Sequence, residues 1–468
     1  MPASPSTARA INDRLALRLL QQEGPLTAGQ LKQLTGLSRP TVADLVERLT
    51  AAGLIGVVGE AGEQRRGPNA RLYGIVADRA HLAALDVRTE GVSVVVSDLV
   101  GHVLAEASVP IGGDTGTGPA VEQAVALVER VVKEAGADRL HTVGIGAPGL
   151  IDPATGELRD STGLPAWHRR LVAALQERFP ESRVTVENET NLAALAEQRD
   201  GVARDRDTFV LLWLGHGTGA AVVLDGALRR GASGGTGEIG FLPVPGTRGL
   251  PSSGDCEGGF HSLAGAAAIV ELAGAHGVTA EGVAAYEPVA VGVVRAAVAL
   301  AGGETGARTG AETAAVADAE ADTRAEPGPD REPGPDPGPA SAPDPGPEPG
   351  PDPEPAPAPD PGPQPEAPVD PRAAARAARF LDALADRIAI GVASVVAILD
   401  PGCVVLGGEV GQAGGEVLAR RVEERIRRMS PLVTVVRPSS LGGGAVLRGA
   451  LLTARDTAQD EIFSPPGR

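Results

Sequence analysis

Residues able to contact DNA gather in one short stretch near the N-terminus. Val42, Leu45, Val46 and Leu49 recur there at helical spacing and predict one buried helix face. The polar residues around them would face outward, where arginine can pair with guanine and hydroxyl groups can bond phosphates or bases. The candidate DNA contacts on this predicted helix are Ser38, Arg39, Thr41, Asp44 and Arg48, and a second group follows at Arg65 and Arg66.

A first helix is predicted just before this stretch. Ile11, Leu15 and Leu19 recur at helical spacing, which predicts the helix. The pair Gly24-Pro25 then ends the helix.

Two further helices and a hairpin must position the candidate DNA contacts. Thr27 and Ser38 are predicted N-caps of the second and third helices. The runs 54–58 and 71–76 predict a β-hairpin whose tip, rich in arginine and glycine, suits a minor groove or a phosphate backbone. Residues 9–76 therefore predict a winged helix-turn-helix. A small helical domain that contacts only proteins, with these charges as a solvated surface, is the alternative.

Charge and composition are distributed unevenly along the 468 residues. The net charge is -18, but residues 1–80 are mildly basic and residues 303–371 are strongly acidic, so the average does not exclude a DNA partner. Only two cysteines are present, which fits a reducing compartment. The N-terminus has no uninterrupted apolar region, and no apolar run is long enough to span a membrane. A cytoplasmic protein without a membrane partner is expected.

The acidic tract is also rich in proline. Half of the 40 prolines lie between Pro327 and Pro371, in repeats with Gly, Asp and Glu. Because proline lacks an amide donor and the tract has almost no large apolar side chains, residues 303–371 predict a disordered surface insertion with polyproline II character. A docking segment for an SH3-like partner is the alternative.

From residue 81 onward the sequence alternates predicted strands and helices, which indicates an α/β domain. The strands 94–101 and 222–226 both run into Asp and Gly turns. Each follows another apolar strand, 82–87 or 209–214. This repeated strand pattern predicts two similar lobes with a cleft between them.

Several motifs in this α/β part resemble the ROK family of repressors and sugar kinases. They are Val143-Gly-Ile-Gly-Ala-Pro-Gly149, Val186-Glu-Asn-Glu-Thr-Asn191, Leu214-Gly-His-Gly-Thr-Gly219, Gly237-Glu-Ile-Gly240, Leu399-Asp-Pro401 and Val404-Val-Leu-Gly-Gly408. The resemblance covers the chain except for the proline-rich insertion. It implies a two-lobed actin-like ATPase fold in residues 81–302 and 372–458 and a homodimer or homotetramer. The added winged helix is similar to the regulator branch of the family, which includes xylose and N-acetylglucosamine repressors.

The motifs that a family kinase needs are altered here. The phosphate turn Asp-x-Gly-Gly-Thr reads Asp86-Val-Arg-Thr-Glu90, so both glycines that let backbone amides approach a phosphate are replaced. The position of the catalytic aspartate holds Glu189, whose extra methylene displaces the carboxylate. The second glycine turn, Gly215–Gly219, remains, and it equally fits an ordinary hairpin bend. We expect no phosphoryl transfer, and no cofactor.

The zinc ligands that the resemblance implies are also mostly missing. Phe241 stands where the family has a histidine, and only Cys256 remains of its cysteine run. Cys256 and His261 could supply two ligands, whereas structural zinc takes four. No metal site is expected, and Cys403 is predicted to be a core residue.

A sugar-binding site is the other implication of the resemblance. By position, the family's sugar ligands correspond here to Asn188, Glu189, Glu238 and His261. Such polar groups in a cleft select a ligand by its hydroxyl groups. In the alternative reading, Asn188 or Thr190 caps a helix and Glu238 only fixes its own turn.

Together these features predict a sugar-responsive DNA-binding transcriptional regulator, a repressor, that binds an operator in double-stranded DNA. Two alternatives stay open. One is a sugar kinase with an appended DNA-binding module, and the other is a DNA-binding protein that responds to no effector.

Overall fold

The computed structural model describes residues 5–61, 70–159, 164–247, 249–252, 254–279, 288–301 and 370–464. Residues 303–369 of the predicted insertion lie outside this part of the chain, so its disorder stays a prediction. The predicted DNA contacts Arg65 and Arg66 also lie outside it.

The N-terminal domain is a winged helix-turn-helix, as predicted. Its helices are α1 (Pro5–Glu23), α2 (Ala28–Thr35) and α3 (Arg39–Ala51), and its strands are β1 (Leu26–Thr27), β2 (Ile55–Ala61) and β3 (Ala70–Ile75). The short strand β1, which the sequence analysis missed, pairs with β3 to give the sheet order β1-β3-β2. Thr27 caps α2 in a capping box with Gln30, and Gly36 ends α2 in the left-handed conformation at φ 68°.

The first predicted helix is present as α1, and its buried side is set by residues other than the stripe that predicted it. Ile11 and Leu15 are exposed, whereas Ala16, Leu17 and Leu20 are buried. Helix α1 carries apolar residues on two sides, so their spacing predicts a helix but does not select the side that packs. That choice is made by the helices and strands against which α1 packs, α2, α3 and β3.

The first lobe is a five-stranded sheet in the order β6-β5-β4-β7-β8, with α4 and α5 packed against it. The first three strands are antiparallel, and β7 and β8 extend the sheet in parallel. The element bounds are η1 (Ala77–Arg79), β4 (His81–Arg88), β5 (Gly91–Asp98), β6 (Val103–Pro110), α4 (Thr117–Glu134), β7 (Leu140–Ala147), α5 (Trp167–Arg178) and β8 (Arg183–Asn188).

The second lobe repeats this topology, in the order β11-β10-β9-β12-β13. Three antiparallel strands are again extended by two parallel ones, which confirms the prediction of two similar lobes. The bounds are β9 (Phe209–Leu214), β10 (Thr218–Leu224), β11 (Ala227–Arg229), η2 (Ile239–Phe241), α7 (His261–Ala264), α8 (Ala266–Ala275), a helix over 289–301, α10 (Pro371–Leu399), β12 (Cys403–Gly407), α11 (Gly408–Met429) and β13 (Val435–Pro438).

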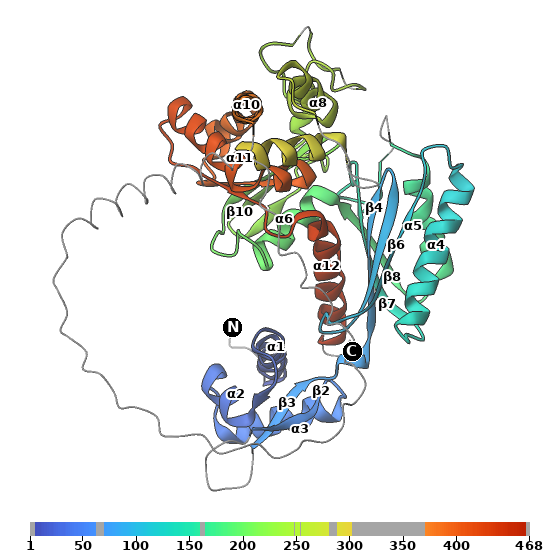
Figure 1. Cartoon of the computed structure of the whole chain (residues 1–468). Coiled ribbons are helices and arrows are strands. Elements are labelled where there is room, and N and C mark those ends of the chain that lie inside the picture. The colour runs from blue at the N-terminus through green and yellow to red at the C-terminus, as the bar shows by residue number, and fades with distance from the viewer. Residues whose placement is uncertain are drawn as a thin grey trace, which may run out of the picture.

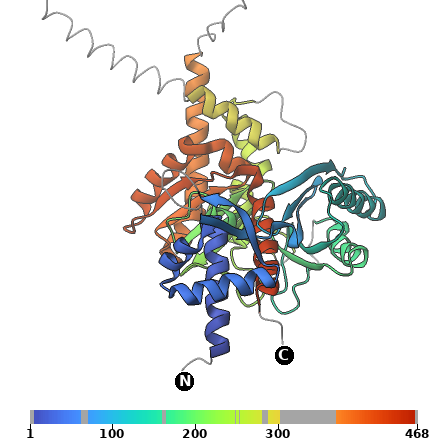
Figure 2. The ribbon, with the colours of Figure 1, turned by 90° about the horizontal axis from the view of Figure 1, so that it is seen from below.

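Two helices fill the space between the sheets. Helix α6 (Glu189–Arg199) and helix α12 (Ala445–Ile462), which follows the short turn η4 (Gly442–Gly444), pack on each other, and α12 also packs on β4 and β7 (Figure 1). Their apolar residues belong to one core cluster that includes residues from both sheets and from the winged helix. The N-terminal domain is therefore packed directly on the lobes, and Figure 2 shows it from below in front of them.

Outer cores complete the two lobes. One lies between the first sheet and α4 and α5, and the other lies between the second sheet and the helices around α10 and α11. Cys403 is fully buried on β12, as predicted. Among the helices in the described ranges, none is long and apolar enough to cross a membrane.

Candidate functional site

A small polar cavity lies where β8 meets α6, opposite β10 and the loop Gly234–Glu238. Its volume is about 100 Å³. Three of the four predicted sugar ligands, Asn188, Glu189 and Glu238, line it. The motifs that suggested these residues come from separate segments of the chain, and the fold brings the segments together.

Asn188 lines the cavity, but its amide is used within the fold. Its Oδ1 accepts hydrogen bonds from the backbone amides of Thr190 at 2.9 Å and Asn191 at 3.2 Å, so Asn188 is the N-cap of α6. Its Nδ2 donates to the carbonyl of Gly149 at 3.0 Å and to Glu189 Oε2 at 2.9 Å. Both donor positions of the amide are thus occupied, and the capping role that the sequence analysis left open is present.

The two glutamates are better placed to meet a ligand. Burial raises the pKa of Glu189 to about 8, and the nearby carboxylates of Glu238 and Asp86 add to this effect. Glu238 stands at the exposed rim, where partial loss of hydration raises its pKa as well. No described residue donates a side-chain hydrogen bond to the carboxylate of Glu238, so it is available to a hydroxyl group.

A further polar group of the cavity escaped the sequence analysis. Thr218 Oγ1 is buried and has no hydrogen-bond partner among the described residues, although it lines the cavity. Trp213, on β9, lines the cavity too and offers it an aromatic wall. Thr218 lies within the second glycine turn, which the sequence analysis considered only as a phosphate turn or a hairpin bend.

His261 is not among the residues that line this cavity. It starts α7, and its ring lies over Gly265, where an added Cβ would be 2.7 Å from the ring carbon Cε1. Loss of hydration lowers the pKa of His261, although Asp255 acts in the opposite sense. The ring therefore lies against the C-cap of α7, and the ligand contact expected from the family position stays a prediction.

The altered phosphate turn lies beside a second cavity of about 400 Å³. Arg88 replaces its first glycine, and the Nε of Arg88 donates to Asp86 Oδ2 at 2.9 Å. Arg88 also pairs with Glu409 of α11 and donates to the carbonyl of Gly443 at 3.0 Å. A guanidinium group therefore lies where a kinase of this family has a glycine, whose backbone amide can approach a phosphate closely.

Within the described ranges, no group of three or more His, Cys, Asp or Glu side chains is arranged to hold a metal ion. Cys256 is a free, partly buried thiol, and burial raises its pKa. Its reactivity as a thiolate ligand is correspondingly reduced.

The predicted DNA-binding face is present on α3. Val42, Leu45, Val46 and Leu49 are buried, as the spacing predicted. Arg39 is exposed at the first turn, and no described residue forms an ion pair with it. Ser38 is the N-cap of α3, and its Oγ lies 2.8 Å from Thr41 Oγ1.

Arg48 and Asp44 take part in a bridge between helices. Arg48 Nη2 lies 2.6 Å from Asp13 Oδ1 on α1, and Nη1 pairs with Asp44. The side chain of Arg48 is only 30% exposed, so it faces α1 rather than open solvent. Helical spacing alone predicts an outward position for Arg48, because it shows which side of a helix is polar but not which partner covers that side.

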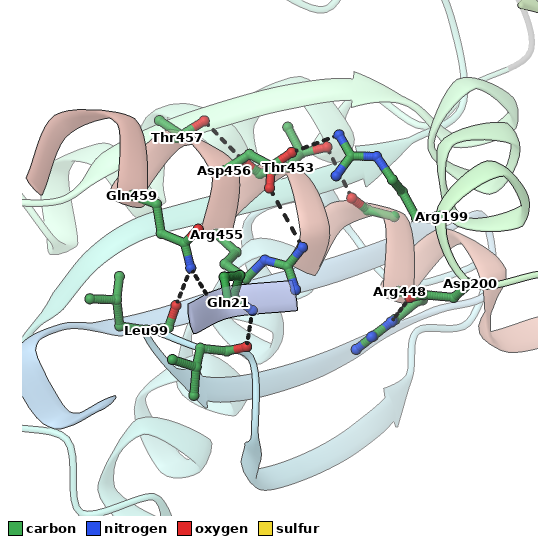
Figure 3. A network of polar contacts seen from close by, with 12 residues as sticks. Gln21, Leu99, Arg199, Asp200, Arg448, Thr453, Arg455, Asp456, Thr457 and Gln459 are labelled. Atoms are coloured by element: carbon green, nitrogen blue, oxygen red, sulfur yellow. Dashed lines mark hydrogen bonds and ion pairs between the residues drawn. The ribbon is translucent and has the colours of Figure 1, made fainter. Parts of the chain in front are cut away.

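A polar network joins the cavity helix to the N-terminal domain through α12 (Figure 3). At the end of α6, Arg199 pairs with Asp456 and Asp200 pairs with Arg448, both on α12. Three residues after Asp456, Gln459 Nε2 donates to Gln21 Oε1 of α1 at 2.7 Å and to the carbonyl of Leu99 at 2.9 Å. One helix thus contacts α6, the first lobe and the winged helix.

Comparison with known proteins gives the relatives of both parts. Residues 82–284 and 371–457, more than half of the chain, match the ROK family, and residues 11–67 match the MarR family. The DNA-binding transcriptional dual regulator NagC of Escherichia coli is 28% identical over 246 residues, which are 50% of this chain and 58% of that protein. The xylose repressor of Bacillus subtilis is 23% identical over 251 residues, or 52% of this chain and 62% of that protein. The matched part thus spans less than two thirds of each relative.

Solved structures share the fold. A ROK family transcriptional regulator described as a homologue of the E. coli MLC protein superposes with a TM-score of 0.64 at 19% identity, covering 97% of this chain and 98% of that one. The ROK hexokinase of Thermus thermophilus gives a TM-score of 0.52 at 24% identity, covering 81% and 99%. The matched segments and the two-lobed architecture agree, and this chain belongs to the ROK family, with a winged helix-turn-helix DNA-binding domain at its N-terminus.

Proposed function

We propose that this protein is a cytoplasmic, sugar-responsive transcriptional repressor that binds an operator in double-stranded DNA as a homodimer or homotetramer. The observation that carries the proposal is the hydrogen bond from α12 to α1 through Gln459 and Gln21, because α12 also packs on α6 beside the polar cavity. The names of the relatives support the same function, because those proteins are described as regulators and repressors.

The effector is a small sugar or sugar derivative. Glu189, Glu238 and Thr218 supply hydroxyl-binding groups, and Trp213 supplies an aromatic wall. Ligand pockets commonly measure about 300–1,000 Å³, so a cavity of about 100 Å³ must widen to admit a hexose. Entry of the effector therefore changes the relation between the lobes. A ligand shifts DNA affinity only as far as it prefers one lobe arrangement over the other.

The proposed DNA contacts come from two segments of the N-terminal domain. Arg39 and Thr41 reach base edges from the start of α3, and Arg65 and Arg66 contact the backbone or a minor groove. Ser38 orients this turn as its N-cap. Arg48 joins α3 to α1 through Asp13, and Asp44 holds Arg48 from within α3, so both residues affect DNA binding through this bridge.

The protein has no kinase activity in this proposal. Arg88 stands in the turn that would hold a phosphate, and its charge is already paired with Asp86 and Glu409. The runner-up function, a sugar kinase, is favoured by the fold that this chain shares with the hexokinase. It predicts ATP turnover with a hexose, which a coupled ADP assay detects.

The test is selection of genomic fragments by the purified full-length protein at fixed, near-physiological salt. Sequencing of the retained DNA should yield discrete sites with a repeated half-site, and Arg39→Ala should lose them, whereas Gln123→Ala on the exposed face of α4 should retain them. Retained fragments without a common site would refute sequence-specific regulation. Normal sites with no response to D-xylose, D-glucose or N-acetyl-D-glucosamine would support the effector-independent alternative for these sugars.

A further inference from the structure

Two turns that face each other across the lobes meet at one ion pair. Arg88 ends β4 in the first lobe, and Glu409 lies in the first turn of α11 in the second lobe. Their side chains pair, and Arg88 also bonds the carbonyl of Gly443 in η4, just before α12. This one guanidinium therefore contacts the first lobe, the second lobe and the start of the central helix.

Glu409 is held close to the second glycine turn. An added Cβ at Gly215 would lie 2.6 Å from Glu409 Oε2 and 2.8 Å from Trp213 Nε1. The carboxylate thus occupies the space that the missing side chain of Gly215 leaves open. Its position at a helix N-terminus is electrostatically favourable. Arg88 is at the first glycine turn and Glu409 is at the second, so the pair lies between the two segments that would hold phosphates in a kinase.

Groups of the first lobe keep Arg88 charged and hold it in place. Burial by itself would lower the pKa of the Arg88 guanidinium, but Asp86 and Glu409 outweigh it and raise that pKa. The carbonyl of Arg88 accepts a hydrogen bond from His168 Nε2 at 3.3 Å, and burial lowers the pKa of His168 to about 4, so this histidine is neutral near pH 7. Backbone and side chain of Arg88 are thus both fixed.

A second pair crosses the lobes at the same cavity. Glu90, two residues after Arg88, lies 3.3 Å from Nε2 of His216 in the second glycine turn. Both side chains are about half exposed, so this contact contributes little by itself. The Glu90–His216 contact lies beside the more buried Arg88–Glu409 pair. Together these two contacts form a seam between the lobes.

We propose that Arg88 and Glu409 form a latch, an internal ion pair that fills the phosphate position and sets how readily the two lobes open. The latch deepens the proposed function and rests on it, because the effector cavity lies between the same two lobes and must widen. Breaking the latch favours the arrangement in which the two lobes are apart. It thereby lowers the free energy needed to widen the effector cavity for a sugar. A bound nucleotide is then unnecessary for holding the lobes together, since the chain supplies its own bridge.

The test measures backbone hydrogen–deuterium exchange in the full-length protein without DNA or sugar. Glu409→Ala removes the cross-lobe partner and leaves Arg88 paired with Asp86. Amides in 86–93 and 213–219 should then exchange about tenfold faster, because the seam opens more often. The matched control is Glu416→Ala on the same helix, which removes an exposed pair with Arg420 and should leave both segments unchanged.

A second variant keeps the test decisive if Glu409→Ala disturbs α11. Arg88→Gln combined with Asp86→Asn removes the guanidinium without leaving a buried carboxylate unpaired, and it should accelerate the same segments. Wild-type exchange rates in both folded variants would overturn the latch. Because neither DNA nor sugar is present, that result would leave the proposed function standing. A working latch in a protein that binds no operator would refute the proposed function alone.

Discussion

Glu189 and Glu238 face one cavity with different surroundings, and this difference decides their chemistry. Glu189 accepts from Asn188 and is withdrawn from water, so near pH 7 it is largely protonated and able to donate as well as accept. Glu238 is exposed at the rim and has no donor among the described side chains. The sequence identified both residues by their motifs. It could not show that the amide of Asn188 is saturated, that His261 does not line the cavity or that Thr218 lacks a partner among the described residues, because these depend on segments far apart in the chain.

The protonation of Glu189 has a measurable effect on stability. Its ordinary pKa is near 4.5 and its folded pKa is about 8, so between these values the folded state holds a proton that the unfolded state has released. Wild-type stability therefore falls as pH rises through this window, at up to about 1.4 kcal/mol per pH unit. Glu189→Gln, which stays neutral, should gain stability relative to wild type between pH 5 and pH 8.

Urea denaturation of both proteins at pH 5, 6.5 and 8 measures this difference. Glu424→Gln, on the exposed surface of α11, is the control and should follow the wild type. An unchanged difference between Glu189→Gln and wild type across the three pH values would show that Glu189 is ionised throughout.

At the scale of elements, α6 is fixed to the segment that leads into α12. Glu197 is fully buried, and its carboxylate accepts from Ser439 Oγ at 2.5 Å, Ser440 N at 3.0 Å and Leu441 N at 3.1 Å. It also accepts from the amide of Val202 at 2.8 Å. The residues that precede η4 are thereby held against the cavity helix.

Removing this carboxylate should weaken the whole fold. Glu197→Ala leaves several buried donors without a partner, and we expect a loss of about 3–5 kcal/mol in the free energy of unfolding. Guanidinium denaturation measures this loss, and Glu424→Ala serves as the surface control. A loss below about 1 kcal/mol, the size of an ordinary surface effect, would contradict the anchoring role.

The elements themselves were largely predictable. The caps at Thr27 and Ser38, the buried stripe of α3 and the apolar strand Phe209–Leu214 are local patterns, and the structure has them. The strand β1 is two residues long and carries no pattern of its own, so it was missed. The packing side of α1 could not be predicted, because tertiary contacts, and not spacing, choose between its two apolar sides.

At the scale of the whole molecule, α12 connects the two functional parts. It begins after Gly443, which Arg88 contacts, and near its end Gln459 bonds Gln21 of the winged helix (Figure 3). Because α12 packs on β4 and β7 of the first lobe and on α6, we expect a shift of one lobe against the other to move α12. Sequence motifs predicted the two lobes and the DNA-binding domain, but the route between them is visible only in the packing.

This arrangement predicts a variant that separates DNA binding from the response to a sugar. Gln459→Ala removes the bonds to Gln21 and Leu99, while the face of α3 stays intact. Operator affinity without sugar should remain within about threefold of wild type, and the change caused by sugar should shrink at least threefold, as expected when a coupling of typical size is partly lost. Fluorescence anisotropy with labelled operator measures both quantities, and Gln123→Ala is the control. A full sugar response in Gln459→Ala would exclude this route.

The most direct test is the affinity of the full-length protein for its selected operator with and without saturating sugar, at one salt concentration, for wild type and Glu238→Ala. The sugar is the one that gives the largest change among D-xylose, D-glucose and N-acetyl-D-glucosamine. We predict that sugar changes the wild-type Kd at least about fivefold, the lower range of allosteric coupling, and that Glu238→Ala binds the operator equally well but no longer responds. An equal response in Glu238→Ala and wild type would contradict the claim that the polar cavity is the effector site of a DNA-binding regulator.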